Sequence, residues 1–167
     1  GLPDCNLNLV CDANPARLKH LKSLYSELEG ETDFQHMLNG AGLDAIVIAT
    51  SVKHHYSMAK ASLSAGKHTF IEKPMASSVA QCEELVEIAK KNGLVLMVGH
   101  TFLYSPSVRK IKQVVDSGDI GEIRYISARR LRPLPGAARA HAGGTQMTGR
   151  LVALGVAAAL TASHTQD

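Results

Sequence analysis

The chain has 167 residues, of which 45% are hydrophobic and 20% charged, and its formal net charge is +3 at pH 7. This composition excludes a disordered or fibrous protein, and without a dense Lys/Arg run a nucleic-acid surface has little support. The longest apolar run, residues 151–160, is shorter than the about 20 residues that a membrane-spanning helix needs. We expect a globular domain with neither a membrane nor a nucleic acid as partner.

Three cysteines, Cys5, Cys11 and Cys82, form neither a C-x-x-C pair nor an even set. Such sparse cysteines are typical of a reducing compartment, so we expect a cytoplasmic protein. The histidines and cysteines lack the spacing of metal ligands, and the sequence has no G-x-S-x-G elbow. We therefore expect no metal site and no nucleophilic triad.

Apolar strand patterns alternate with amphipathic helix patterns as far as residue 130. The predicted strands cover residues 6–11, 43–49, 68–72, 94–98 and 122–130. The predicted helices begin at Pro15, after the N-cap candidate Asn14, and near residues 33, 55, 79 and 106. Ser78 and Gln81 have the spacing of a capping box. This alternation predicts an α/β fold, a doubly wound parallel sheet with helices on both faces.

The pattern breaks near Arg132. Residues 133–166 contain no Asp, Glu, Lys or aromatic residue, and neither period is sustained. Residues 151–160 are apolar enough for a short helix, which would lack a polar face. We therefore expect a partial domain over residues 1–132 and an irregular Ala/Gly-rich tail over residues 133–167. A shifted reading frame or an alternative terminal exon would produce this break, and so would a genuine flexible tail.

Asp12 follows the first predicted strand and precedes a capped helix. At this position of a doubly wound sheet, a carboxylate accepts hydrogen bonds from the ribose hydroxyls of an adenine dinucleotide. The same charge repels a 2′-phosphate, so Asp12 favours NAD over NADP. The alternative is a plain turn residue, which is a common role for Asp.

Polar groups also follow the next three predicted strands. They are Thr50 and His55, then Glu72, Lys73 and Pro74, then Gly99 and His100. Ligands of open parallel sheets bind outside the carboxyl ends of the strands, so four such ends on one edge predict a binding site. Lys73 can donate a proton there, with Glu72 pairing its charge and a cis bond to Pro74 aiming it. The alternatives are surface histidines and an ordinary salt-bridged lysine.

Several spaced segments resemble the Gfo/Idh/MocA family of nicotinamide-dependent oxidoreductases. They are Asp12 after its strand, IATSVKHH (48–55), AGKHTFIEKPMA (65–76) and VGHTFLYSPSVRKIKQVVDSGDIGEI (98–123). The resemblance covers residues 2–130 and implies a Rossmann-like domain. Its GHTFLYSP stretch is most similar to members that act on nucleotide-linked sugars and related sugars or cyclitols.

The resemblance implies roles for particular residues. The implied cofactor-binding residues are Asp12, Thr50, His55, Glu72, Lys73 and Pro74. Lys73 is also the implied catalytic residue, relaying a proton while a hydride passes between a substrate carbinol carbon and C4 of the nicotinamide. The resemblance further implies NAD as the cofactor, a small sugar-type substrate and, for a full-length form, a homo-oligomer.

The sequence departs from the family pattern in three respects. Ser51 stands where the family usually has Pro, and none of the 14 glycines supplies the family's G-x-G-x-x-G turn, which holds the pyrophosphate. Nothing after Arg132 resembles the family's substrate domain. We therefore expect a Rossmann-like domain that lacks the first strand, glycine turn and helix. The alternative is a non-catalytic truncated relative that retains a nucleotide- or partner-binding fold.

Overall fold

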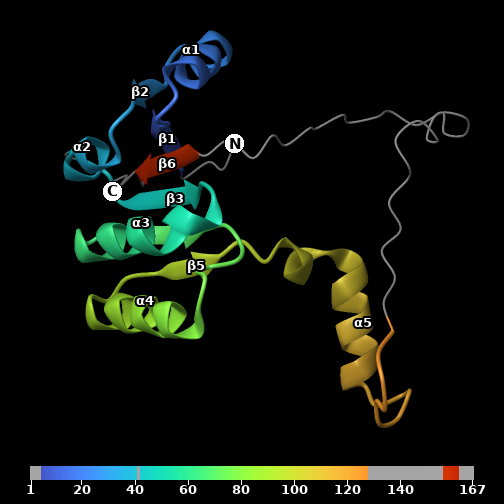
Figure 1. Cartoon of the computed structure of the whole chain (residues 1–167). Helices are drawn as coiled ribbons and strands as arrows, with labels where there is room; N and C mark the ends of the chain where they lie inside the picture. Colours follow the sequence, from blue (N-terminus) through green and yellow to red (C-terminus); the bar gives the residue numbers. More distant parts are fainter. Residues whose placement is uncertain (1–4, 41, 128–155, 162–167) are drawn as a thin grey trace, which may run out of the picture. The chain divides into compact units, whose positions relative to one another are not determined.

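The computed structural model describes residues 5–40, 42–127 and 156–161, which fall into two units (Figure 1). The elements of the first unit are β1 (Asn6–Cys11), α1 (Pro15–Leu24), β2 (Glu29–Glu31), α2 (Phe34–Asn39), β3 (Ala45–Ala49), α3 (Val52–Ser64), β4 (His68–Ile71), α4 (Val79–Lys91), β5 (Leu96–Val98) and β6 (Val156–Thr161). The elements of the second unit are the 3-10 helix η1 (Thr101–Tyr104) and α5 (Pro106–Asp116).

The strands of the first unit form one sheet in the order β2-β1-β6-β3-β4-β5. β1 pairs with β2, β3 with β4, and β4 with β5, all in parallel. β6 lies between β1 and β3 and runs antiparallel to both. The predicted α/β sheet is confirmed, with five parallel strands and one antiparallel strand at its centre.

Helices cover both faces of the sheet, as the sequence predicted. In the larger hydrophobic cluster, Cys11 and Ile48 pack with residues of α2, α3 and α4, such as Leu63. A smaller cluster joins Val10 to Leu18 of α1. Because Val10 and Cys11 are consecutive in β1, their side chains point to opposite faces. α1 therefore lies on one face, and α2, α3 and α4 lie on the other.

The predicted helix caps are present. The Asn14 side chain accepts a hydrogen bond from the Ala16 N–H at 3.0 Å, with Pro15 at the first helical position. The Ser78 hydroxyl accepts from the Gln81 N–H at 3.3 Å, and the Gln81 side chain accepts from the Ser77 N–H at 3.1 Å. α3 begins at Val52, three residues before its predicted start. These caps fix where α1 and α4 leave the preceding loops.

The tail was expected to be irregular, yet Val156–Thr161 is a strand. Its apolar, alanine-rich sequence suggested a short helix, because alanine has the highest helix propensity. Between β1 and β3, however, an extended segment bonds its backbone on both sides, and this tertiary context overrides local preference. Residues 133–155 and 162–167 of the expected tail lie outside the described residues.

The predicted strand over residues 122–130 is wrong for its described part. Residues 122–127 form no strand, and the side chains of Tyr125 and Ile126 are more than four-fifths exposed. An apolar alternating segment becomes a strand only beside a partner strand, and the described residues of the second unit contain none. Residues 128–130 lie outside the described part of the chain.

Within the described part of the chain, every helix is too short or too polar to cross a membrane.

Candidate functional site

The register of the sheet aligns the carboxyl ends of four parallel strands. Cys11 of β1 and Ile48 of β3 both pair with Ala157 of β6. Ile48 pairs with Ile71, and Ile71 pairs with Val98. The following residues, Asp12, Ala49, Glu72 and Gly99, therefore stand in one row at one edge of the sheet. Since neighbouring strands lie about 4.8 Å apart, the predicted convergence of strand ends is confirmed.

Asp12 is held rigidly at the end of β1. Its side chain is only 4% exposed, and one oxygen accepts the Asn14 N–H at 2.8 Å. The other oxygen lies 3.4 Å from the Arg17 guanidinium, and the Asp12 N–H donates to the Glu31 carbonyl at 3.1 Å. Sequence reasoning missed Arg17, whose signal is its place in the first turn of the helix that follows Asp12. The carboxylate is thus fixed at the sheet edge beside one cation.

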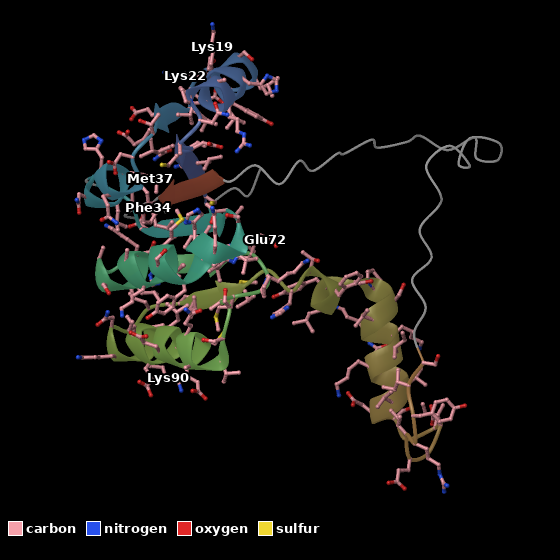
Figure 2. The ribbon with its side chains drawn as sticks, viewed as in Figure 1. Lys19, Lys22, Phe34, Met37, Glu72 and Lys90 are labelled. Atoms are coloured by element: carbon pink, nitrogen blue, oxygen red, sulfur yellow. The ribbon has the colours of Figure 1, made fainter. Side chains whose placement is uncertain are left out.

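Glu72 and Gly99 lie against each other at the ends of β4 and β5. A Cβ on Gly99 would meet Glu72 Oε1 at 3.1 Å and the Phe70 ring at 3.2 Å. The Gly99 N–H donates to the Ile71 carbonyl at 2.8 Å, which fixes this close approach. The absence of a side chain at Gly99 therefore leaves space for the Glu72 carboxylate at the edge of the sheet. Glu72 is labelled in Figure 2.

Lys73 and Pro74 extend beyond the strand. Both are exposed, and the peptide bond between them is cis, as the sequence analysis suggested. The Lys73 backbone N–H donates to the Glu72 carboxylate at 3.2 Å. Glu72 thus contacts the backbone of Lys73. The expected ion pair between the two side chains is absent from the contacts of the described residues.

Thr50 and His55 complete the predicted set. Thr50 is half-buried at the end of β3, and His55 is buried in the first turns of α3. The His55 ring contacts two backbone carbonyl oxygens, those of Thr50 and Pro74. The six predicted site residues thus gather at one edge of the sheet, and His55 lies beneath its surface.

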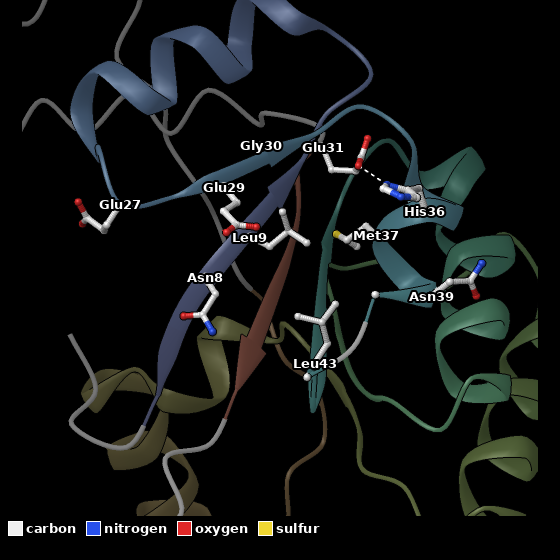
Figure 3. A pocket seen from close by; sticks show the side chains of 12 residues that line it. Asn8, Leu9, Glu27, Glu29, Gly30, Glu31, His36, Met37, Asn39 and Leu43 are labelled. Carbon is white, nitrogen blue, oxygen red and sulfur yellow. Dashed lines mark hydrogen bonds and ion pairs between the residues drawn. The ribbon is translucent and has the colours of Figure 1, made fainter.

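A cavity of about 650 Å³ lies elsewhere, beside β1, β2 and α2 (Figure 3). Its lining includes Glu27, Glu29, Glu31 and His36, and none of the six predicted site residues. Glu31 pairs with His36, which lowers the pKa of Glu31 and raises that of His36. Three carboxylates there oppose the binding of an anionic dinucleotide, so the sheet edge remains the candidate site.

Two other kinds of site find no support in the described residues. No group of three or more His, Cys, Asp or Glu side chains there could hold a metal ion. Burial, together with the charges of Glu31, Asp33 and Asp12, raises the pKa of the Cys11 thiol to about 11. Cys11 is therefore a neutral core thiol at neutral pH, not a nucleophile.

Comparison with known proteins identifies the family. Residues 2–100 match the model of the Gfo/Idh/MocA oxidoreductase family, described by its NAD-binding Rossmann fold. This match spans more than half of the chain, so the chain belongs to that family. The matched residues include β1 to β5 and all six candidate site residues, and they exclude β6.

Similar proteins include dehydrogenases of cyclitols and sugars. Inositol 2-dehydrogenase of Salmonella typhimurium is 30% identical over 72% of this chain and 36% of its own length. D-xylose dehydrogenase of Paenarthrobacter nicotinovorans is 33% identical over 71% of this chain and 30% of its own. The chain thus spans about a third of the length of the curated relatives it matches.

A solved structure of scyllo-inositol dehydrogenase from Lactobacillus casei, with bound NAD(H) and scyllo-inositol, superposes with a TM-score of 0.65. It is 30% identical in sequence, and the match covers 70% of this chain and 35% of that one. Myo-inositol 2-dehydrogenase from Lactobacillus plantarum gives a TM-score of 0.66 at 27% identity, over 71% and 35% of the two chains.

Proposed function

We propose that this chain is the cofactor-binding part of an NAD-dependent oxidoreductase that acts on a CH–OH group of a cyclitol or sugar. The observation that carries the proposal is the single row of Asp12, Glu72 and Gly99 at the carboxyl edge of the sheet, with Lys73 next to it. Membership of the family and the inositol and xylose dehydrogenases among the relatives support the substrate class.

The residues at this edge fit the two ribose groups of a dinucleotide. The Asp12 carboxylate would accept hydrogen bonds from the adenosine ribose, and Glu72 would lie near the nicotinamide ribose. Asp12 and Glu72 stand on strands separated by two others, which suits an extended ligand laid across the edge. Thr50, between them at the end of β3, would contact its middle portion.

The charge at Asp12 favours NAD over NADP. A 2′-phosphate on the adenosine ribose would meet the buried carboxylate, which opposes its binding. Arg17 contacts that carboxylate and moderates the repulsion. A direct comparison of NADH and NADPH binding therefore belongs to the test.

Lys73 would handle the proton of the reaction. NAD, when bound, supplies the acceptor for the hydride that leaves the carbinol carbon with its bonding electron pair. The hydroxyl proton of the substrate then passes to the Lys73 amine, and the carbinol becomes a carbonyl. In the reverse direction the Lys73 ammonium returns the proton to the carbonyl oxygen. We further propose that the substrate is a small molecule, that the protein is cytoplasmic, and that the whole protein is a homo-oligomer.

A second reading is a relative that binds a nucleotide or a partner without catalysis. The two readings differ in whether a substrate is turned over, so binding and turnover must be measured separately.

The test of cofactor binding is a titration of the ¹⁵N-labelled chain with NADH and, separately, NADPH. We expect amide shifts at residues 12–14, 50–52, 72–73 and 99–100, larger with NADH at equal concentration. Shifts confined to residues 27–43, around the cavity of Figure 3, would contradict the assignment of the site.

The test of catalysis uses a protein that joins these residues to a substrate domain. With NAD and myo-inositol, scyllo-inositol or D-xylose, we expect Lys73→Ala to lower turnover by about 100-fold or more, since positioned proton transfer contributes at least that factor. The affinity for NADH should change by less than about twofold. Lys67→Ala is the control, because Lys67 directly precedes β4 whereas Lys73 follows it. Unchanged turnover in Lys73→Ala would refute the proposed role.

A further inference from the structure

His55 has an environment that a cofactor contact does not require. The residue is 1% exposed, within the first turns of α3. Its Nδ1 lies 2.8 Å from the Pro74 carbonyl oxygen, and its Nε2 lies 3.0 Å from the Thr50 carbonyl oxygen. Both polar atoms of the ring are therefore engaged with backbone, and a ligand outside the protein has no edge of the ring to reach.

Carbonyl oxygens accept hydrogen bonds and cannot donate them, so each contact needs a proton on the ring nitrogen. A ring with one proton donates to one carbonyl, and a ring with two protons donates to both. The two nitrogens lie on different sides of a rigid ring, which lets one side chain bridge two separate backbone segments. A glutamine offers N–H groups at only one position, and its oxygen would face the other carbonyl.

The two bridged segments belong to the two halves of the candidate site. Thr50 follows β3, and Pro74 directly follows Lys73. The ladder between β3 and β4 ends where the Glu72 N–H donates to the Ile48 carbonyl at 2.9 Å. Beyond this bond the two backbones leave the sheet, and the His55 ring connects them again.

We propose that His55 is a positioning residue, which ties the segment after β4 to the end of β3 and so holds Lys73 at the edge of the sheet. Its consequence for catalysis rests on the proposed function, whereas the tie itself does not. The role differs from the direct cofactor contact that the family resemblance implied for His55. Its removal should loosen residues 73–76 while the rest of the sheet keeps its order.

The first test is amide hydrogen exchange in the whole chain. His55→Phe keeps an aromatic ring and removes both nitrogens, and His55→Gln keeps one donor. We expect exchange at residues 73, 75 and 76 to rise about tenfold in the Phe variant and by less in the Gln variant, because the Thr50 and Pro74 carbonyls then lose their contacts with the ring and the segment opens more often. Exchange at Leu85 and Ala89, buried in α4, should stay unchanged.

The same substitutions at His54, an exposed neighbour on α3, are the matched controls and should leave exchange at residues 73–76 unchanged. An equal rise at residues 73–76 and in α4 would mean that His55 supports the whole core, and it would overturn the proposal. Unaltered exchange at residues 73–76 in His55→Phe would overturn it as well.

The second test follows NADH-induced amide shifts in the same variants. In His55→Phe we expect the shifts at residues 72–73 to shrink at least threefold and those at residues 12–14 to persist. If both sets persist at full size, the tie does not hold the nicotinamide end and the proposal fails. If the unmodified chain shows no shifts with NADH, the proposed function fails, while the exchange experiment still decides the role of His55.

Discussion

The Gly99 position at the candidate site leaves little room for a side chain. The position where its Cβ would stand is 3.1 Å from Glu72 Oε1 and 3.2 Å from the Phe70 ring. The Gly99 backbone is bonded to Ile71, so the Phe70 ring and the Glu72 carboxylate would have to shift by a few tenths of an ångström to admit a Cβ. The requirement for glycine is thus a matter of space, since its φ is not in the left-handed region.

We expect Gly99→Ala to lower the free energy of unfolding by about 1–3 kcal/mol, as overpacking typically does. Gly30→Ala is the control, because its added Cβ would stand 3.6 Å from Leu18, an ordinary contact. That variant should change stability by less than about 0.5 kcal/mol in urea unfolding. Equal effects of the two substitutions would show that Glu72 moves aside at no cost.

The Glu31–His36 pair makes stability depend on pH. Its hydrogen bond raises the pKa of His36, and that contribution is present below the ordinary value of 6.5 and lost as pH rises through the folded-state pKa. The same bond lowers the pKa of Glu31, and that contribution is present above the ordinary value of 4.5 and lost as pH falls. The pair therefore stabilises most between those two values.

We expect His36→Gln to lower the urea midpoint more at about pH 5.5 than at about pH 8.5. The difference should be small, because the pair is exposed, and it should shrink in high salt. His20→Gln, on the exposed part of α1, is the control. A loss that is the same at both pH values would mean that charge pairing contributes nothing.

Sequence reasoning placed the candidate residues better than it described their contacts. Asp12 and Glu72 could be located because a polar residue after a buried strand must lie at the edge of the sheet. The Arg17 contact and the His55 bridge could not, since each depends on how a side chain from one element reaches the backbone or side chain of another. Periodicity gives faces and ends of elements, and it contains no information on such contacts.

At the scale of elements, β6 decides whether the sheet is continuous. It pairs with β1 along residues 6–11 and with β3 along residues 45–49. In the described sheet, β1 and β2 on one side meet β3, β4 and β5 on the other through this strand. The distance between Asp12 and Glu72 is therefore set by the backbone hydrogen bonds that residues 156–161 make to β1 and β3.

We expect Ala158→Pro to destabilise the chain by several kcal/mol. Ala158 lies opposite Val10 and Val47, and proline removes an N–H from the centre of the ladder and leaves an acceptor unpaired. Glu29→Pro in β2, an edge strand with one neighbour, is the control and should cost less. Similar thermal midpoints for Ala158→Pro and the unmodified chain would contradict the central place of β6.

The longer elements were predictable, and the exceptions have physical reasons. The apolar patterns of β1 and β3, and the caps of α1 and α4, are local signals that tertiary structure reinforces. β2 is three residues long with two glutamates, so no pattern marked it. The strand at Val156–Thr161 was missed because partners far away in the sequence, rather than its own residues, make it extended.

At the scale of the whole molecule, the row of strand ends is present without a glycine turn. Two charge-assisted hydrogen bonds to a pyrophosphate contribute about 3–6 kcal/mol, which is about 100-fold to 10⁴-fold in affinity. We therefore expect the 167-residue chain to bind NADH far more weakly than micromolar, by fluorescence or NMR titration. Micromolar affinity would show that other residues hold the pyrophosphate.

The sheet order also sets the time course of folding. Asn6 of β1 lies opposite Thr161 of β6, whereas the β3–β4 and β4–β5 pairs join strands that are close in sequence. Pairing between strands that are distant in sequence is slow, because closing the long loop between them costs chain entropy before the stabilising contacts form. The three-stranded half can therefore assemble early, and the edge that gathers Asp12 and Lys73 becomes one surface only when the last strand is inserted between the two halves.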